Sequence, residues 1–507
     1  MLVNSLLATV ERYPDKIAVK DPTRELTFSQ LLTFAQTIER TVAKETTCPR
    51  VGLMLPTTAA GLGTIAGILW AGRTFVPLNF LLQPVELERI VADAQIDLVI
   101  STIHFQEILS QVPVRTLYLE KLGLKRRYLW SKLCSPPPPP VVGPDDLAAI
   151  VYTSGTSGEP KGVCLTHANF LSNAKAIVEH IRITADDHFV AVLPNFHVFG
   201  LTVLNFVPMI LGTSLTCIPR FSPQDMHRAI VEDRTNLVIA IPSMFSALSR
   251  LKTLDRAEFS HVKVAASGGE PLPSRVYEEV YARTGMRIIE GYGMTETSPI
   301  ISADLPWAHK PGTVGPPLAG VEVQLRDAQG NVIPLPTSRG LSSAPTDQPA
   351  VAPEGELYVR GPLVMKGYYH KPAETAAAID AQGWLRTGDI VRIDADGYIK
   401  ITGRAKDLII VGGENVYPRE IEEVLDRHPA VEESAIIGRK DGLRGEAIVG
   451  FVKLREGCSV SSTDLRAFCR ESLAGFKVPR EIHIRSDLPR GPTGKILKRE
   501  LPSLLQQ

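Results

Sequence analysis

Cysteine is scarce in this sequence. Only 6 cysteines occur among 507 residues, and they form no CxxC pair and no regular framework. A disulfide framework is therefore not expected, and free, mostly buried thiols in a reducing cytoplasm are the simpler interpretation. The six are Cys48, Cys134, Cys164, Cys217, Cys458 and Cys469.

Excess charge of either sign is also missing. Lys and Arg together number 55, Asp and Glu together number 55, and the formal net charge is zero. Without a net field, nonspecific binding to nucleic acid is not expected. The 44% hydrophobic content with dispersed charge is typical of an ordered globular protein. The chain exceeds a typical single domain, which predicts two or more units.

A secretory leader and an uninterrupted membrane span are lacking. Met1–Lys16 has no basic start followed by a long apolar run, so we expect no signal peptide. A cytoplasmic protein is expected instead. Phe189–Pro219 contains no Asp, Glu, Lys or Arg and is long enough to cross a bilayer. Pro194, Gly200 and Pro208 interrupt it, which favours a strand, a loop and a buried helix inside an α/β core. The lining of a site for an apolar ligand would also fit.

Short apolar runs alternate with helix-length segments along the chain, which is typical of an α/β fold. The apolar positions between Phe170 and Ile181 follow helical spacing and predict an amphipathic helix. Pro136–Pro140 must be extended, and Leu335–Pro353, rich in Pro, Ser, Gly and Ala, is expected to be a mobile loop. The strand-like runs include Val51–Leu55, Leu98–Ile100, Ala148–Tyr152 and Leu237–Ile241.

A smaller unit is predicted to follow residue 405. Its first helix opens with Pro418, a residue suited to the first turn of a helix, and carries Ile421, Val424 and Leu425 on one face. The remaining length, about a hundred residues, is enough for a separate lid-sized domain. Its other expected elements are strands at Ala435–Gly438 and Ile448–Leu454 and a helix near Leu465–Leu473.

The most informative segment runs from Tyr152 to Gly162. It places four Ser/Thr hydroxyls, three glycines and one lysine in a loop after a buried strand. Glycines let the backbone approach an oxyanion, hydroxyls and amides donate to it, and Lys161 offsets its charge, a combination suited to a polyphosphate. On composition alone, an ordinary turn is the alternative. The pattern is not a Walker A motif, and Val163–Leu165 predicts a second strand and hence a hairpin.

This loop resembles the phosphate loop of the adenylate-forming superfamily: acyl-CoA synthetases, peptide-synthetase adenylation domains and beetle luciferases. Five further family motifs follow in order, so the resemblance covers essentially the whole chain. It implies an α/β fold with a large N-terminal domain of layered α/β subdomains plus a β-barrel-like part, residues 1–404, and a small mobile α+β C-terminal domain, residues 405–507. The motifs are Ser267–Pro271, Gly291–Glu296, Trp384–Asp389, Gly403–Glu422 and Pro489–Lys498.

The resemblance implies a site for ATP. Tyr292 would lie against the adenine, next to Gly293, and a bare backbone would form the opposite wall. Asp389 would accept hydrogen bonds from the ribose hydroxyls, helped by Arg404. The other expected cofactor-binding residues are Gly268, Gly269 and Glu270 at the adenine and Thr153, Ser154, Gly155, Thr156, Ser157, Gly158 and Lys161 at the phosphates.

The resemblance also implies the catalytic residues. Thr295 would donate to a phosphate, and Glu296 would hold Mg²⁺ between phosphates. Lys495 would reach both the acid's carboxylate and the α-phosphate, where its charge stabilises the transition state. His197 could gate the acyl pocket, and a purely structural role is the alternative.

The reaction implied is an ATP-dependent ligation in two halves. A carboxylate attacks the α-phosphate and pyrophosphate leaves; a thiol then attacks the acyl carbon and AMP departs. The family uses positioning and charge, so no acyl-enzyme on a cysteine is expected. The C-terminal domain is expected to rotate about Lys406 between the halves, which would bring Gly412 and Gly413 to the thiol's entry.

The expected acid is a medium- or long-chain fatty acid, with aryl acids second. Relatives that activate amino acids place an aspartate near the segment corresponding to Phe196–Gly200, and no Asp occurs between Asp187 and Asp225. That segment instead resembles fatty acyl-CoA synthetases. Coenzyme A is the expected thiol. A separate acyl carrier protein is the rival, because the chain itself holds no carrier-domain serine motif.

Two patterns point elsewhere, and one other function class stays open. Gly61–Ala66 matches GxGxxA, but the candidate acid Glu86 lies in an apparent helix and the motif is common by chance. Lys121–Lys132 is basic and aromatic without an acid, so it could contact an anionic membrane surface; a solvated helix or loop is the alternative. A non-catalytic acyl-adenylate binder is disfavoured, because the candidate catalytic residues are intact.

Overall fold

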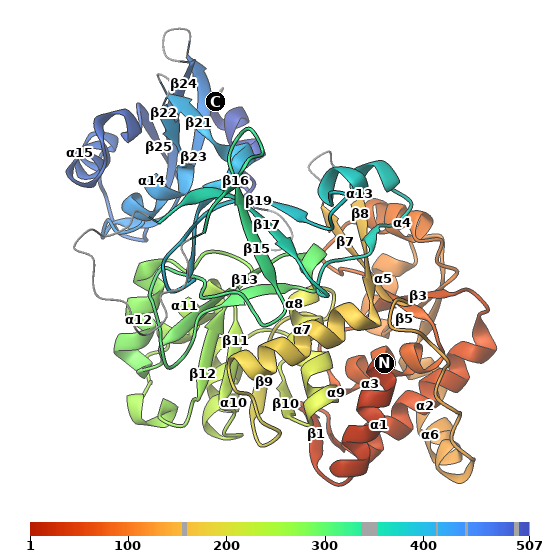
Figure 1. Ribbon diagram of the computed structural model, residues 1–507. Coiled ribbons are helices and arrows are strands. Elements are labelled where there is room, and N and C mark those ends of the chain that lie inside the picture. The colour runs from red at the N-terminus through yellow and green to blue at the C-terminus, as the bar shows by residue number, and fades with distance from the viewer. Residues whose placement is uncertain (155–159, 336–351, 412–413, 442–444, 491–495, 506–507) are drawn as a thin grey trace, which may run out of the picture.

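The computed structural model describes residues 1–154, 160–335, 352–411, 414–441, 445–490 and 496–505. These residues form a large domain with three sheets and a small domain with one. Figure 1 shows the small domain, in blue, standing over the end of the large domain that carries the five-stranded sheet. A large N-terminal and a small C-terminal α/β domain confirm the predicted fold class. The exact boundary at residues 404 and 405 stays a prediction.

The first sheet has eight strands, and its six inner strands run parallel. All four residues of its central strand β11 are buried, as expected for a parallel sheet covered on both faces. In spatial order the strands are β14 (Ile300–Ala303), β13 (Ile288–Gly293), β12 (Val264–Ser267), β11 (Leu237–Ala240), β9 (His188–Ala191), β10 (Ser214–Cys217), β1 (Ile17–Asp21) and β2 (Arg24–Thr27).

The second sheet has seven strands and includes the predicted hairpin. Its strands β7 and β8 pair antiparallel, with Thr153 opposite Lys161, so the expected second strand after the phosphate loop is confirmed. In spatial order the strands are β18 (Gly367–Tyr368), β8 (Pro160–Thr166), β7 (Leu147–Ser154), β4 (Thr74–Pro77), β3 (Arg50–Met54), β5 (Leu98–Ser101) and β6 (Arg115–Tyr118).

The third sheet of the large domain has five antiparallel strands and corresponds to the part expected to be barrel-like. The small domain holds the fourth sheet, packed on two helices that match the predicted ones. The third sheet contains β16 (Val332–Ile333), β15 (Glu322–Arg326), β17 (Glu354–Arg360), β19 (Leu385–Ile393) and β20 (Ile399–Arg404). The fourth contains β22 (Glu414–Val416), β21 (Ile409–Val411), β24 (Gly445–Leu454), β23 (Val431–Asp441) and β25 (Glu481–Arg485).

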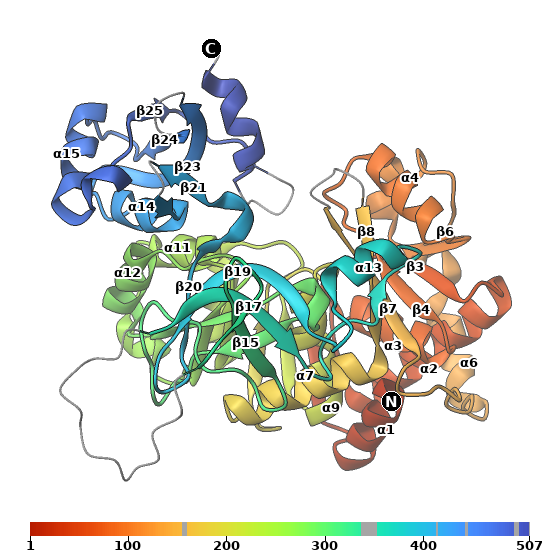
Figure 2. The same ribbon diagram turned by 45° about the horizontal axis from the view of Figure 1, so that its top comes forward.

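The helices cover the faces of the two α/β sheets and one side of the small domain (Figures 1 and 2). In the large domain they are α1 (Leu2–Arg12), α2 (Phe28–Glu45), α3 (Ala59–Trp70), α4 (Pro84–Asp93), α5 (Gln106–Leu109), α6 (Leu124–Leu133), α7 (His167–His180), α8 (Val198–Leu201), α9 (Val207–Leu211), α10 (Pro223–Val231), α11 (Pro242–Ser249), α12 (Ser274–Thr284) and α13 (Pro372–Ala378). In the small domain they are α14 (Pro418–Leu425) and α15 (Ser462–Ser472).

Helix α7 joins the two α/β sheets. It is the predicted amphipathic helix, and it begins at a capping box in which Thr166 and Asn169 bond reciprocally. It packs against β8 of the second sheet and β14 of the first. The buried Asn173 donates to the carbonyl of Ile300 at 2.7 Å and accepts from its amide at 3.2 Å. Its side chain thus fixes α7 to the first sheet.

The uncharged stretch Phe189–Pro219 is an interior segment, as predicted. It contains β9, then the short buried helices α8 and α9 with a π-helical turn between them, then β10. Along the described part of the chain, no helix combines the length and the apolar character that crossing a membrane requires.

The glycines of Gly61–Ala66 are packing residues rather than a dinucleotide loop. Gly61 and Gly63 are buried within the first turns of α3. A Cβ at Gly63 would lie 2.2 Å from Cδ1 of Phe34 on α2. The two helices pack this closely only because the position lacks a side chain.

Gly63→Val is therefore expected to lower the free energy of unfolding by about 1–3 kcal/mol, because the added methyl groups force Phe34 or α2 to shift. Thermal and urea unfolding of the purified protein would measure the change. Gly475→Ala is the matched control, since its Cβ would meet nothing within 4 Å. Equal stability of the Gly63→Val variant and the parent would contradict this account of α2 and α3.

Candidate active site

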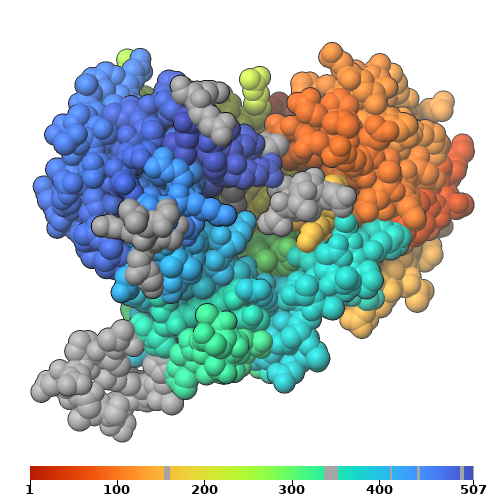
Figure 3. Space-filling model, turned by 90° about the horizontal axis from the view of Figure 1, so that it is seen from above, coloured from red at the N-terminus to blue at the C-terminus, as the bar shows by residue number. Residues whose placement is uncertain are grey.

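The candidate site residues lie where several strands of the large domain end. The hairpin β7–β8 carries Thr153 and Lys161, and the parallel strands β12 and β13 lead to Gly268 and Tyr292 at their carboxyl ends. In α/β sheets, ligands bind in the crevice outside these carboxyl ends. Figure 3 shows the surface hollowed between the small domain and the orange N-terminal part. In Figure 2, β7 and β8 end beside this region.

Asp389 is a buried carboxylate with a partner on each oxygen. The Tyr292 hydroxyl donates to its Oδ2 at 2.5 Å, and Nε of Arg404 lies 2.9 Å from its Oδ1. The antiparallel pairing of β19 with β20 places Asp389 opposite Arg404, and Tyr292 comes from β13 of another sheet. The Asp389 side chain is 5% exposed and that of Arg404 is 54% exposed. The pair thus reaches from the interior to solvent.

Tyr292 acts as a fixed hydrogen-bond donor in this group. Burial, and then the charge of Asp389, raise the pKa of its phenol well above the ordinary value. The phenol therefore keeps its proton throughout the physiological pH range. The resemblance implied contact of Tyr292 with adenine, which stays a prediction; the bond to Asp389 was not anticipated. Thr387, also missed, lies two residues before Asp389 on β19, and its hydroxyl accepts from the Asp389 amide at 3.1 Å.

Glycines near the carboxyl ends of β12 and β13 leave the backbone there without side chains. A Cβ at Gly268 would lie 3.2 Å from the ring of Phe199 and 3.3 Å from the carbonyl oxygen of Gly291. A Cβ at Gly293 would lie 1.8 Å from the carbonyl oxygen of Pro299, so no other residue fits there. Gly269 has a positive φ of +86°, a conformation that favours glycine. These contacts explain why the motif residues are glycines.

Lys161, Tyr368 and Glu296 form a second group. The Tyr368 hydroxyl donates to Oε1 of Glu296 at 2.8 Å, and the Lys161 ammonium lies 5.2 Å from the centre of the Tyr368 ring. Lys161 follows the phosphate loop, whereas Glu296 lies in a short 3₁₀ turn, Thr295–Thr297, just past β13. Sequence reasoning found the lysine and the glutamate but missed Tyr368, which carries no motif signal of its own.

The second group suits a Mg²⁺ ion that is shared with phosphates. Mg²⁺ prefers oxygen donors and is usually held by one or two carboxylates together with substrate phosphates. Glu296 supplies such a carboxylate, and the Tyr368 hydroxyl donates to its Oε1. Across the described ranges, no three His, Cys, Asp or Glu side chains gather into a site for a metal ion. A single carboxylate of this kind fits a metal that arrives with a nucleotide.

His197 starts helix α8, and its Nδ1 accepts from the amide of Phe199 at 3.2 Å. This capping bond orients the imidazole at the carboxyl end of β9. The gating role expected of His197 stays a prediction. Phe199, two residues on, lies against Gly268.

Several expected site residues are not among those described. They are Gly155, Thr156, Ser157, Gly158, Gly412, Gly413 and Lys495, together with the side chain of Ser154. Lys406 is described: it is exposed in the 3₁₀ turn Ala405–Asp407, directly after β20. Glu270 is half-buried and lies two residues after Gly268, beyond the end of β12.

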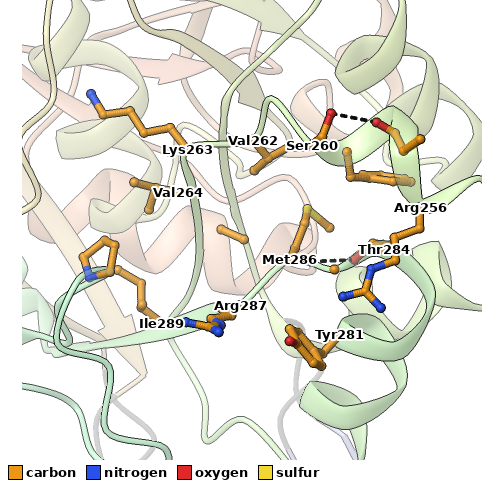
Figure 4. A pocket seen from close by; sticks show the side chains of 15 residues that line it. Arg256, Ser260, Val262, Lys263, Val264, Tyr281, Thr284, Met286, Arg287 and Ile289 are labelled. Atoms are coloured by element: carbon orange, nitrogen blue, oxygen red, sulfur yellow. Dashed lines mark hydrogen bonds between the residues drawn. The ribbon is translucent and has the colours of Figure 1, made fainter.

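A separate pocket of about 530 Å³ lies at the opposite ends of the same strands (Figure 4). Val264 and Ile289 near the starts of β12 and β13 contribute to its floor, and Arg256, Tyr281 and Arg287 stand around it. None of the candidate catalytic residues lines it. It is therefore not part of the candidate active site.

Comparisons with known proteins agree with this geometry. The AMP-binding enzyme family matches residues 6–369, and the C-terminal domain of AMP-binding enzymes matches residues 420–495. A long-chain-fatty-acid–CoA ligase of Bacillus subtilis (strain 168) is 32% identical over 99% of this chain and 94% of its own length. A feruloyl-CoA synthase of an Amycolatopsis species is 32% identical over 89% of this chain and 88% of its own.

This chain is also similar in three-dimensional structure to a solved protein. ATP-bound MatB from Rhodopseudomonas palustris superposes with a TM-score of 0.88 and 28% identity. The superposition covers 100% of this chain and 99% of MatB. The similarity therefore includes the small domain as well as the large one.

Tyr292→Phe is expected to weaken AMP binding about tenfold, because Asp389 loses a hydrogen bond worth roughly 1–2 kcal/mol and is no longer held in place. Isothermal titration with AMP would measure the loss. Tyr398→Phe is the control: it removes a similar hydroxyl, bonded at 2.6 Å to the carbonyl of Ala308 outside the group around Asp389. Unchanged AMP affinity in Tyr292→Phe, or equal losses in both variants, would show that the hydroxyl does not position Asp389.

Proposed function

The chain belongs to the family of AMP-binding enzymes, and from this we propose that it is an ATP-dependent acid–thiol ligase. It activates a fatty acid as acyl-AMP with release of pyrophosphate, then transfers the acyl group to coenzyme A, giving acyl-CoA and AMP. One observation carries the proposal. The Tyr292–Asp389–Arg404 group and the Lys161–Tyr368–Glu296 group are joined by the short segment from Tyr292 to Glu296, which suits a nucleoside beside its phosphates.

In the first half-reaction the acid's carboxylate oxygen attacks the α-phosphorus of ATP, and the bond to the pyrophosphate breaks. Asp389 and Arg404 hold the ribose, and Thr295 donates to a phosphate. Mg²⁺, when bound through Glu296, offsets the negative charge of the phosphates. Lys161 adds charge from the hairpin, and Lys495 would add it at the α-phosphate. These residues position reactants and stabilise charge without forming a bond to them.

In the second half-reaction the thiol loses its proton and its sulfur attacks the acyl carbon. The bond from that carbon to the phosphate oxygen breaks, and AMP leaves with the electron pair. Two buried cysteines are poorly suited to take the acyl group themselves. Burial raises the pKa of Cys164 to about 11 and that of Cys469 to about 11, so neither is ionised near neutral pH. Cys458 is the exposed one, and it lies in the small domain. Direct transfer from acyl-AMP to the external thiol is therefore proposed.

A fatty acid is the proposed substrate, with an aryl acid as the alternative. The segment after β9 offers Phe196 and Phe199 and no aspartate, and Phe196 meets Phe80 edge-on with ring centres 4.9 Å apart. An amino-acid substrate would leave its ammonium group unpaired there. The two curated relatives described above are named for a fatty acid and for an aryl acid. Coenzyme A is the proposed thiol, with a separate acyl carrier protein as the alternative.

The small domain is proposed to turn between the two half-reactions about Lys406. This residue lies in the short turn between β20 of the large domain and β21 of the small one. One ion pair between the domains joins Arg455 of the small domain to Glu279 of α12 at 3.8 Å. A partly exposed ion pair of this kind contributes little, roughly 0–1 kcal/mol, so it opposes rotation only weakly.

Contact of α6 with an anionic lipid surface is a second, separate proposal. Leu129, Trp130 and Leu133 are 55%, 56% and 87% exposed on this helix. Every charged residue of Lys121–Lys132 is basic. Exposed aromatic and aliphatic side chains beside cations can supply apolar area and charge to a membrane interface, although α6 has no separate apolar face. Fatty acids partition into the same interface, so the contact would favour substrate capture.

The ligase proposal predicts acid-dependent AMP release with fatty acids. Release would be measured with acids from C4 to C18 and with a hydroxycinnamic acid, with and without coenzyme A. Turnover of C8–C16 acids that requires coenzyme A is the expected result. Glu296→Gln should lower the rate about 100-fold, whereas Glu322→Gln, an exposed residue paired with Arg360, should not. Acyl-AMP that coenzyme A cannot discharge would assign the thiol role to a carrier protein. No AMP release with any acid would refute the ligase.

The lipid proposal predicts sedimentation with vesicles of phosphatidylglycerol and phosphatidylcholine. Each cation near an anionic surface contributes about 1 kcal/mol, so neutralising all five charges of Lys121–Lys132 should lower the bound fraction at least tenfold. Phosphatidylcholine vesicles alone are the control. Sedimentation that is unaffected by the five substitutions would dispose of the membrane contact.

A further inference from the structure

Tyr368 links two residues that the sequence places far apart. Its hydroxyl donates to Oε1 of Glu296 at 2.8 Å. The ammonium of Lys161 lies 5.2 Å from the centre of its ring. One side chain thus contacts both the carboxylate proposed for Mg²⁺ and the lysine that follows the phosphate loop, and neither the family resemblance nor any motif singled it out.

The backbone around Tyr368 is bound to the same two segments. Strand β18 pairs antiparallel with β8, with Tyr368 opposite Val163. The amide of Tyr369 donates to the carbonyl of Gly162 at 2.7 Å, and the amide of Met365 donates to the carbonyl of Glu296 at 2.8 Å. The hairpin, the glutamate turn and β18 are therefore tied together by backbone bonds on both sides of the tyrosine.

The segment before β18 is also fixed to α7. The amide group of Asn169 donates to the carbonyls of Pro362 and Val364 at 2.8 and 2.9 Å. The amide of Tyr368 donates to Oγ1 of Thr375 at 2.9 Å, and Gly367 lies so close to Thr375 that a Cβ there would approach it to 2.8 Å. These bonds fix the backbone of this two-residue edge strand, from which the Tyr368 ring projects.

The Tyr368 hydroxyl is a hydrogen-bond donor at this position. A phenol keeps its proton near neutral pH, and this one occupies one carboxylate oxygen of Glu296. The bond orients the carboxylate, whose other oxygen can then face a cation. The face of the ring attracts the Lys161 ammonium and restricts its position.

We propose that Tyr368 is a positioning residue that aims Glu296 at Mg²⁺ and Lys161 at the phosphates of ATP. The proposal rests on the proposed function, because it requires MgATP as the ligand. It assigns two separable roles to one side chain: the hydroxyl orients the carboxylate, and the ring orients the lysine. Tyr368→Phe removes the first role only, and Tyr368→Leu removes both.

The test is equilibrium binding of ATP to the full-length protein without any acid, measured by calorimetry over a Mg²⁺ series. Tyr368→Phe is expected to raise the Mg²⁺ concentration for half-maximal ATP binding about tenfold, as is usual when a residue that orients a metal ligand is removed. Saturating Mg²⁺ should restore its ATP affinity. Tyr368→Leu should stay weaker even at saturating Mg²⁺, because Lys161 has lost the ring.

Tyr369→Phe is the matched control. This neighbouring tyrosine stacks on His370 with ring centres 4.0 Å apart and lies beneath Arg50, so its variant should give the parent's Mg²⁺ curve. Thermal unfolding of each variant checks that it is folded. A Tyr368→Phe curve that coincides with the parent's would overturn the proposal, as would a loss of ATP binding that Mg²⁺ cannot restore.

The outcome also separates this proposal from the proposed function. If the parent releases AMP in an acid-dependent reaction while Tyr368→Phe keeps the parent's Mg²⁺ curve, the ligase stands and the role of Tyr368 is refuted. If the parent fails to bind ATP at any Mg²⁺ concentration, both proposals are refuted.

Discussion

Two buried asparagines on one helix hold the candidate site together. Asn173 bonds to both backbone groups of Ile300, just beyond the segment that carries Tyr292 and Glu296. Asn169 bonds to the backbone that leads into Tyr368. Helix α7 itself follows directly from the strand that carries Lys161. Because a buried amide without partners is costly, these bonds specify how the two α/β sheets meet.

The candidate site has a buried part in the large domain, and the small domain beside it is held by weaker contacts. Asp389 and Tyr292 are buried, and Gly293 lies too close to Pro299 to carry a side chain, so the proposed nucleoside site is largely preformed. The segment from Tyr292 to Glu296 connects it to the phosphate side over a few residues. Preformed donors and charges reduce the reorganisation that a bound nucleotide requires. The small domain, by contrast, contacts α12 through the ion pair of Arg455 with Glu279, whose atoms lie 3.8 Å apart.

Much of this was predictable from the sequence, and the exceptions have a common cause. The strand runs, the helix at Phe170 and the hairpin after Tyr152 follow from local periodicity, and they are confirmed. Asp389 and Arg404 were paired through the family motifs, and antiparallel pairing puts them opposite each other. Tyr368 was missed because its contacts come from pairing with strands about two hundred residues earlier, which no local pattern encodes. Gly61 and Gly63 matched a motif for an unrelated reason, close helix packing.

Arg404 belongs both to the candidate nucleoside site and to the connection between the two domains. Its guanidinium pairs with Asp389, and its backbone is the last residue of β20 before the turn that leads to the small domain. A ligand that engages this guanidinium therefore acts on the residue next to the linker. By thermodynamic reciprocity, any orientation of the small domain that shifts Arg404 changes ligand affinity by the same factor that the ligand changes the population of that orientation. Ligand occupancy of the site and the orientation of the small domain are then linked, so a change in one shifts the other.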